Sequence, residues 1–193
     1  MQELSITEKL AEISRYIYKK GLSPGKSGNI SIRSKEIVAI TPTDVSLRDI
    51  DPDRVILVDF EGNVLMGNEK PSSEIFLHIN VYKCRDDING IVHSHSPYAT
   101  SFALSGEVIK RLDEFGKRGR PHFKMIKYAP PGSQNLAELA AESLKKEDVV
   151  ILKGHGVVTT SASIDDAVVL AEIVEETAKV QFLARLLNKD VKN

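Results

Sequence analysis

Cysteine and long apolar runs are both scarce in this chain of 193 residues. The single cysteine, Cys84, excludes an internal disulfide framework, and we expect it to pack in a helix in a reducing, cytoplasmic setting. No apolar run approaches the roughly 20 residues of a membrane span, and residues 1–10 lack the basic and apolar regions of a signal peptide. We therefore expect no membrane partner.

An excess of charge of either sign is also missing, because 26 lysines and arginines balance 27 aspartates and glutamates. The net charge of −1 excludes a general attraction to nucleic acid, so affinity for an anionic ligand must come from a local site. The sequence contains no internal repeat and no low-complexity segment. With 41% hydrophobic residues, residues 1–193 can form one well-packed core, and we predict a single domain.

The hydrophobic pattern predicts an α/β protein. Apolar residues at helical spacing predict helices, which lie at 7–20, 72–85, 96–106, 133–146 and 163–187. Short β-prone runs predict strands at 29–34, 36–41, 89–95 and 123–128, a hairpin at 54–67, and two strands joined by a tight turn at 148–160. Since hairpins dominate the first half, we expect a largely antiparallel central sheet between helices, a three-layer α/β/α fold.

Two helix starts carry specific signals. Ser96 followed by Pro97 is typical of an N-cap and the first helical residue, and Ser163 with Asp166 three residues later is typical of a capping box. In the first helix, one side is expected to be buried, and it consists of Leu10, Ile13, Tyr16 and Ile17.

Histidine is rare, with five in the chain, yet His93 and His95 are only two positions apart at the end of a predicted strand. Residues i and i+2 of a strand point to the same face, so both imidazoles can aim at one metal ion. Taken alone, the pair also fits two unrelated polar residues. His155 lies between Gly154 and Gly156 after another apolar strand, where glycines permit a sharp turn and a close backbone approach. Three such histidines fit a catalytic zinc, which keeps an open position.

The other two histidines have weaker signals. His78 lies four residues after Glu74, on the same face of a predicted helix. This spacing could ligate a metal, but a packed histidine or one that supports the site is favoured. His122 belongs to the basic stretch 116–124, which is expected to be a solvated loop, and it is a weaker candidate for a substrate contact.

An anion site is predicted where loop 26–29 and the start of the 72–85 helix supply polar groups. Ser72 and Ser73 stand at a helix N-terminus, where free N–H groups and the dipole favour an anion. Simple capping by either serine is the alternative, and Thr43 lies in a turn from which its hydroxyl could also reach an anion. Glu74 follows directly, and its residue type fits a surface carboxylate, a metal ligand or a proton-transfer group.

Five motifs in a fixed order make the chain resemble the class II aldolase/adducin family over nearly its whole length. They are SGNIS at 27–31, TPT at 41–43, KPSSE at 70–74, HSH at 93–95 and GHG at 154–156. The resemblance implies an α/β/α fold and homotetramers with active sites at subunit interfaces. It is greatest to members that cleave L-fuculose 1-phosphate to dihydroxyacetone phosphate and L-lactaldehyde.

The resemblance also implies roles for residues. It implies one Zn²⁺ per subunit held by His93, His95 and His155, with Glu74 as both a fourth ligand and the catalytic acid/base. The phosphate group of the substrate would be held by a larger set, consisting of Ser27, Gly28, Asn29, Thr43, Ser72 and Ser73.

One segment departs from the family. In bacterial aldolases a tyrosine of the neighbouring subunit, located after the HxH helix, protonates the aldehyde oxygen. The corresponding segment here, residues 106–121, contains no tyrosine. His122, Tyr128 or a residue of the C-terminal tail are the candidates that could replace it.

Other activities remain open at this point. Pentulose-phosphate 4-epimerases of the family carry an aspartate at the position of Glu74 and extend further at the C-terminus, which disfavours them. A methylthioribulose-1-phosphate dehydratase shares the three histidines and the glutamate. An adducin-like interaction domain would lose the metal ligands, and a structural zinc favours four closed ligands, often with cysteine.

Overall fold

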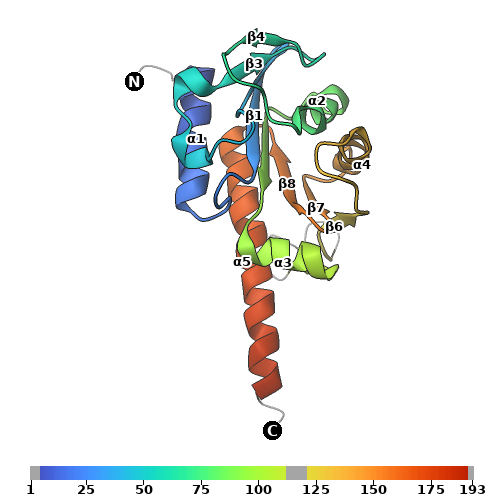
Figure 1. Ribbon diagram of the computed structural model, residues 1–193. Coiled ribbons are helices and arrows are strands. Elements are labelled where there is room, and N and C mark those ends of the chain that lie inside the picture. Colours follow the sequence, from blue (N-terminus) through green and yellow to red (C-terminus); the bar gives the residue numbers. More distant parts are fainter. Residues whose placement is uncertain (1–4, 112–120, 191–193) are drawn as a thin grey trace.

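The computed structural model describes residues 5–111 and 121–190, with side chains of the second range up to residue 187. Within them, eight strands form one mixed sheet at the centre of the fold (Figure 1) in the order β4-β3-β2-β1-β5-β8-β7-β6. The strands are β1 (Asn29–Ser34), β2 (Ile37–Ile40), β3 (Ile56–Val58), β4 (Val64–Met66), β5 (Gly90–Ser94), β6 (Lys124–Ile126), β7 (Val149–Leu152) and β8 (Gly156–Ser161). Neighbouring strands are antiparallel except β6 and β7, which confirms the largely antiparallel sheet.

Helices cover both faces of the sheet, so the predicted three-layer α/β/α fold is confirmed (Figure 1). The helices are α1 (Ile6–Lys19), α2 (Ile75–Cys84), α3 (Pro97–Ser105), α4 (Gln134–Leu144) and α5 (Ile164–Asp190). Helices α2 and α4 pack on one face, while α1, α3 and α5 pack on the other. Successive side chains of β7 point to opposite faces of the sheet. Val150 packs in the core beneath α2 and α4, while Val149 and Ile151 pack in the core on the other face.

The order of helices and strands agrees with the prediction, but some details differ. Two short 3₁₀ turns, η1 (Leu47–Asp49) and η2 (Pro52–Arg54), were not predicted. The expected burial of Tyr16 was wrong, since its side chain is 38% exposed and its hydroxyl donates to Glu172 of α5. Cys84 lies half-buried in α2, and burial raises the pKa of its thiol, in keeping with a packing role.

Helix α3 is capped from a distance. Ser96 occupies the N-cap position and Pro97 follows it, as predicted, but the Ser96 side chain makes no capping hydrogen bond. Instead the carboxylate of Glu175 in α5 accepts from the backbone N–H groups of Tyr98 at 3.0 Å and Ala99 at 2.9 Å. An acidic group at a helix N-terminus also complements the helix dipole. The contact therefore fixes the helix that follows the HxH motif onto α5.

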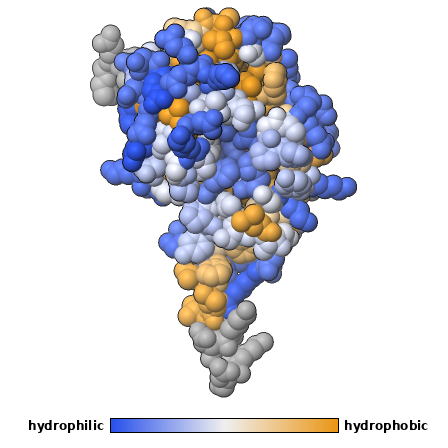
Figure 2. Space-filling view, viewed as in Figure 1, coloured by the Kyte–Doolittle hydropathy of each residue, from blue (hydrophilic) through white to orange (hydrophobic). Residues whose placement is uncertain are grey.

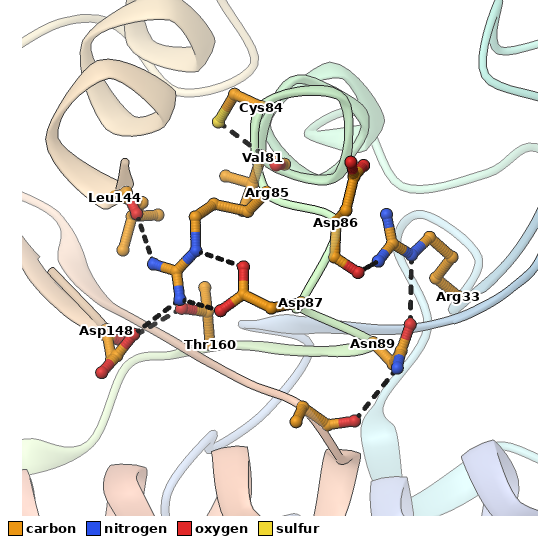
Figure 3. A network of polar contacts seen from close by, with 11 residues as sticks. Arg33, Val81, Cys84, Arg85, Asp86, Asp87, Asn89, Leu144, Asp148 and Thr160 are labelled. Atoms are coloured by element: carbon orange, nitrogen blue, oxygen red, sulfur yellow. Dashed lines mark hydrogen bonds and ion pairs between the residues drawn. The ribbon is translucent and has the colours of Figure 1, made fainter. Parts of the chain in front are cut away.

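Two arginines fix the C-terminal end of α2 (Figure 3). Arg33 of β1 donates to the carbonyl of Tyr82 at 3.1 Å and to the carbonyl of Asp86. Arg85 donates to the carbonyl of Leu144, the last residue of α4, at 2.9 Å. Since carbonyls at a helix C-terminus lack partners within the helix, these contacts hold α2 against β1 and α4. The N-terminal end of α2 begins directly after the KPSSE motif.

The C-terminal half of α5 extends beyond the rest of the structure (Figure 1), and Figure 2 shows hydrophobic residues gathered on it. The exposed apolar side chains there are Val180, Phe182, Leu183, Leu186 and Leu187. Within the described ranges, α5 and the other helices all fall short of the length and apolarity needed to cross a membrane.

Replacement of Glu175 by alanine is expected to destabilise the fold by about 1–2 kcal/mol, because two N–H groups in the first turn of α3 lose their acceptor. The change is measured from urea unfolding curves. Glu176→Ala is the matched control, since Glu176 is exposed and only reaches Lys179 at 3.7 Å, and it should change stability by less than about 0.5 kcal/mol. Equal effects of the two substitutions would contradict the capping role.

Candidate active site

Strand β5 brings the two histidine motifs together. Its His93 lies opposite Asn29 of β1 on one side and Val158 of β8 on the other. The turn before β8 carries His155, and Gly156 lets it approach, because a Cβ there would lie 2.5 Å from the carbonyl oxygen of Ser94. A side chain larger than hydrogen would push the two motifs apart.

The three imidazoles form a compact cluster. His93, His95 and His155 each offer one nitrogen, and these atoms lie within 4.8 Å of one another. Nε2 of His93 lies 3.0 Å from Nε2 of His95. Two nitrogens bound to one tetrahedral zinc at about 2.0–2.1 Å would be about 3.3 Å apart. The spacing of the imidazoles therefore fits a single divalent transition metal.

The backbone sets the tautomer of His93. Its Nδ1 lies 3.0 Å from the carbonyl oxygen of Val157, which can only accept, so Nδ1 carries the proton. Nε2 then faces the cluster and lies 3.1 Å from Oε2 of Glu74. A metal-binding histidine is usually held in this way by a carbonyl or carboxylate on its other nitrogen.

Glu74 is the N-cap residue of α2 and is buried beside the cluster. Its Oε2 accepts from Nδ2 of Asn29 at 3.0 Å, whereas Oε1 has no hydrogen-bond partner among the described residues and lies 3.9 Å from Nε2 of His155. Burial alone would raise the pKa of Glu74, but the charge of His93 and hydrogen bonds from His93 and Asn29 outweigh it and lower the pKa. An ionised carboxylate with one unsatisfied buried oxygen fits a site for a cation.

Burial controls the protonation of the histidines. It lowers the pKa of His95 to about 3 and that of His155 to about 4, with a further contribution from the charge of His93. For His93, burial opposes protonation, but Glu74 outweighs it and raises the pKa. Two of the three imidazoles are thus neutral near pH 7, which is the form that binds metal.

A cavity of about 150 Å³ opens beside Glu74 and His155. Its lining includes five of the six predicted phosphate residues, which are Gly28, Asn29, Thr43, Ser72 and Ser73, together with Lys26 and Asp44. Ser27 is not among the lining residues, and its hydroxyl donates to the carbonyl of Pro24. Gly28 requires the absence of a side chain, since it has φ +76 and a Cβ would lie 2.7 Å from the carbonyl oxygen of His93.

Sequence reasoning missed two features of this cavity. The side-chain amide of Asn29 donates to Glu74 through Nδ2 and accepts from His78 through Oδ1, so it links the cavity to the imidazole cluster. Asp44, with φ +58, adds a carboxylate to a lining that also contains Lys26. The only signal for Asp44 was its place in the TPTD turn, whereas the contacts of Asn29 depend on tertiary structure.

The remaining candidates lie apart from the cluster. His78 is fully buried in α2 and bonds to Asn29, outside the group of metal-ligating nitrogens, which agrees with the favoured supporting role. Tyr128 packs its ring against Gly154, next to His155, and is 58% exposed. His122 lies in an isolated bridge with Lys110. Most of the segment without tyrosine, residues 112–120, lies outside the described residues.

Comparison with known proteins identifies the family of this chain. Residues 8–182 match the family described as Class II Aldolase and Adducin N-terminal domain. The chain is 34% identical over 180 residues to an L-fuculose phosphate aldolase of Methanococcus maripaludis, covering 93% of this chain and 97% of the relative. It is 32% identical to a 3-oxo-tetronate 4-phosphate decarboxylase of Haemophilus influenzae, covering 94% and 89%. A solved L-fuculose 1-phosphate aldolase superimposes with a TM-score of 0.89 at 29% identity, covering 97% and 89%.

In the presence of a chelator, the protein is expected to lose stability as the pH falls from about 7 to about 5. Folding lowers the pKa of His78, His95 and His155 below 6.5, so their contribution is complete above the unfolded pKa and is lost as the pH falls toward the folded values. His93, whose pKa is raised, contributes in the opposite sense and only partly offsets them. Urea midpoints measured across this range test the sign.

His95→Gln is the informative variant for this pH dependence, because it removes one of the three groups with a lowered pKa. Its midpoint should vary less steeply with pH than that of the unaltered chain. A midpoint that does not change with pH, or that rises as the pH falls, would contradict the prediction.

Proposed function

Because the chain belongs to the class II aldolase and adducin N-terminal domain family, we propose that it is a zinc-dependent aldolase. The proposed reaction is the reversible cleavage of L-fuculose 1-phosphate to dihydroxyacetone phosphate and L-lactaldehyde. The observation that carries the proposal is the position of Glu74, between the imidazole cluster and the polar cavity. An adducin-like interaction domain has no need for this combination.

Class II aldolases depend on a metal ion, and we propose zinc for this chain. His93, His95 and His155 would hold the ion, with Glu74 as a fourth ligand before substrate binds. When bound, the ion supplies a Lewis acid that stabilises the negative charge left when the carbon–carbon bond breaks. The neutral state of His95 and His155 supports this assignment.

The phosphate group of the substrate is proposed to occupy the cavity beside the N-terminus of α2. Ser72 and Ser73 stand directly before Glu74, the N-cap residue of that helix, and Gly28 and Thr43 also line the cavity. The positive end of the α2 helix dipole favours an anion there. Lys26 adds a positive charge at the same place, so the substrate would be oriented by its phosphate.

Glu74 is proposed as the group that moves the proton on the enediolate carbon of dihydroxyacetone phosphate. Its lowered pKa keeps it ionised, which is the form that can remove a proton. Oε2 is held by Asn29, whereas Oε1 has no partner among the residues described and is available for the transfer. The second product requires a proton on the aldehyde oxygen, and we favour Tyr128 as its source, because the ring of Tyr128 lies against Gly154, the neighbour of His155.

A decarboxylase of a phosphorylated 3-oxo acid is the second candidate, and the lack of tyrosine in residues 106–121 favours it. In that reaction the bond to the carboxylate breaks, carbon dioxide leaves, and the electron pair remains as the same enediolate, which then takes a proton at carbon. Carbon dioxide leaves without a proton, so no acid for an aldehyde oxygen is needed. The decarboxylase relative of Haemophilus influenzae lends support.

A homotetramer with interfacial active sites, in the cytoplasm, stays a prediction. The exposed apolar side chains at the end of α5 support it, since they form a surface that a second copy of this chain would cover. Light scattering gives the number of chains directly.

A product assay over five substrates decides between the candidate functions. We expect cleavage of L-fuculose 1-phosphate, with no comparable turnover of L-rhamnulose 1-phosphate, L-ribulose 5-phosphate, methylthioribulose 1-phosphate or 3-oxo-tetronate 4-phosphate. A chelator should abolish cleavage while the far-UV circular dichroism is unchanged, and about one equivalent of Zn²⁺ per chain should restore it. Full activity after thorough removal of metal would exclude the proposed mechanism, and turnover of the 3-oxo acid alone would favour the decarboxylase.

Glu74→Gln is expected to slow exchange of the enediolate-carbon proton of dihydroxyacetone phosphate with solvent by about 10²–10⁴-fold, because the amide cannot accept the proton. The exchange is followed by NMR in D₂O. Glu69→Gln is the control, since Glu69 pairs with Arg54 away from the cluster and its replacement should leave exchange unchanged. Normal exchange in the Glu74 variant would remove this residue from its proposed role.

A further inference from the structure

Residues on one face of strand β1 have nearly the same spacing as residues on one face of helix α2. Two residues of a strand advance about 6.7 Å and four residues of a helix advance about 6.0 Å. Asn29 and Ser31 therefore lie on one face of β1 at nearly the spacing of Glu74, His78 and Tyr82 in α2. The structure pairs them in sequence, Asn29 with Glu74 and His78, and Ser31 with His78 and Tyr82. We call Asn29, Ser31, His78 and Tyr82 the buried ladder.

The hydrogen bonds of the buried ladder have one consistent direction. Nδ2 of Asn29 donates to Glu74, so Oδ1 of Asn29 faces Nε2 of His78 at 2.6 Å and can only accept. His78 therefore carries its proton on Nε2, and its Nδ1 accepts from Oγ of Ser31 at 2.7 Å. The hydroxyl of Tyr82 lies 2.8 Å from Oγ of Ser31 and donates to the carbonyl oxygen of Ser31 at 3.1 Å. From Ser31 through His78 to Asn29, each proton points toward Glu74.

Burial makes this arrangement rigid. Ser31 and His78 are completely buried, Tyr82 is 1% exposed and Asn29 is 7% exposed. A rotated side chain would leave a buried donor or acceptor without a partner, which is more costly than the loss of an exposed hydrogen bond. Burial also lowers the pKa of His78 to about 3, so the ring stays neutral and keeps one donor and one acceptor.

The buried ladder acts on only one oxygen of Glu74. Oε2 receives the hydrogen bond from Asn29, while Oε1 has no hydrogen-bond partner in the described part of the chain. A packing role alone does not require this asymmetry. It gives the carboxylate a fixed orientation in which one oxygen is held and the other is available.

We propose that His78 is a positioning residue for the reaction, because it orients the amide of Asn29, which in turn orients the carboxylate of Glu74. The proposal rests on the role given to Glu74 in the proposed function. His78 touches neither substrate nor metal. It acts by making the alternative orientation of the Asn29 amide, with its oxygen toward the carboxylate, unfavourable.

Two substitutions at His78 test the proposal in the zinc-loaded protein. His78→Gln supplies an amide donor for Asn29 and an acceptor for Ser31, whereas His78→Leu supplies neither at a similar volume. We expect His78→Leu to slow proton exchange of dihydroxyacetone phosphate by about 10–100-fold, with KM for the sugar phosphate unchanged. His78→Gln should stay within about threefold of the unaltered chain.

Thr159→Val is the matched control, since Thr159 is also completely buried and donates to the carbonyl of Ala167 in α5, on the opposite face of the sheet. It should lower the urea midpoint without changing exchange per folded molecule. Normal exchange in folded His78→Leu, or equal impairment of the leucine and glutamine variants, would overturn the proposal.

A measurement without turnover covers the case in which His78→Leu does not fold. In the unaltered chain, ¹⁵N resonances of His78 should show a neutral ring protonated on Nε2, both with chelator and with zinc. A proton on Nδ1 would overturn the proposal. If the unaltered chain exchanges no proton with dihydroxyacetone phosphate, the proposed function fails, and the buried ladder is still decided by this tautomer and by zinc affinity, which should fall about 10-fold in His78→Leu and not in His78→Gln.

Discussion

The candidate site depends on the antiparallel pairing of β5 with a neighbour on each side. The register places Asn29 of β1 and Val158 of β8 on either side of His93. A shift of this register by one residue would turn His93 to the opposite face of the sheet, away from Glu74 and His155. Gly156 makes the correct register possible, because its missing side chain leaves space for the carbonyl of Ser94. The histidine cluster, the carboxylate of Glu74 and the cavity all depend on these strand contacts.

The strand register also buries ionisable side chains close together, where burial disfavours their charged forms. His95 and His155 respond by staying neutral, and Glu74 stays ionised only because His93 and Asn29 compensate for its burial. A divalent cation would satisfy the carboxylate and three nitrogens at once, and binding to the folded chain alone would stabilise it. Metal binding at this cluster would therefore link stability to the proposed activity through one set of side chains.

Local signals in the sequence were sufficient for most of the fold. Alternating apolar residues and capping signals predicted the order of the helices and strands, since these depend on neighbours in the chain. The 3₁₀ turns were missed although Ser46 and Pro52 stand at their starts. The cap of α3 and the contacts of Asn29 could not be predicted, because Glu175 and Glu74 come from distant segments. The histidine motifs were recognisable, but their convergence is a property of the strand register.

The contacts between β1 and α2 bear on one half of the proposed reaction, the proton transfer at the enediolate carbon, and not on the other half, the release of the second product. In the proposed reaction, formation and protonation of the enediolate would depend on Glu74 and the buried ladder, which lie in β1 and along α2, a helix that two arginines fix in place. The departure of the second product, an aldehyde or carbon dioxide, would depend on groups outside β1 and α2. An aldehyde needs a proton on its oxygen, and carbon dioxide does not. Under the proposed chemistry, the choice between aldol cleavage and decarboxylation would therefore depend on groups other than Glu74 and the buried ladder, because both reactions use the same enediolate.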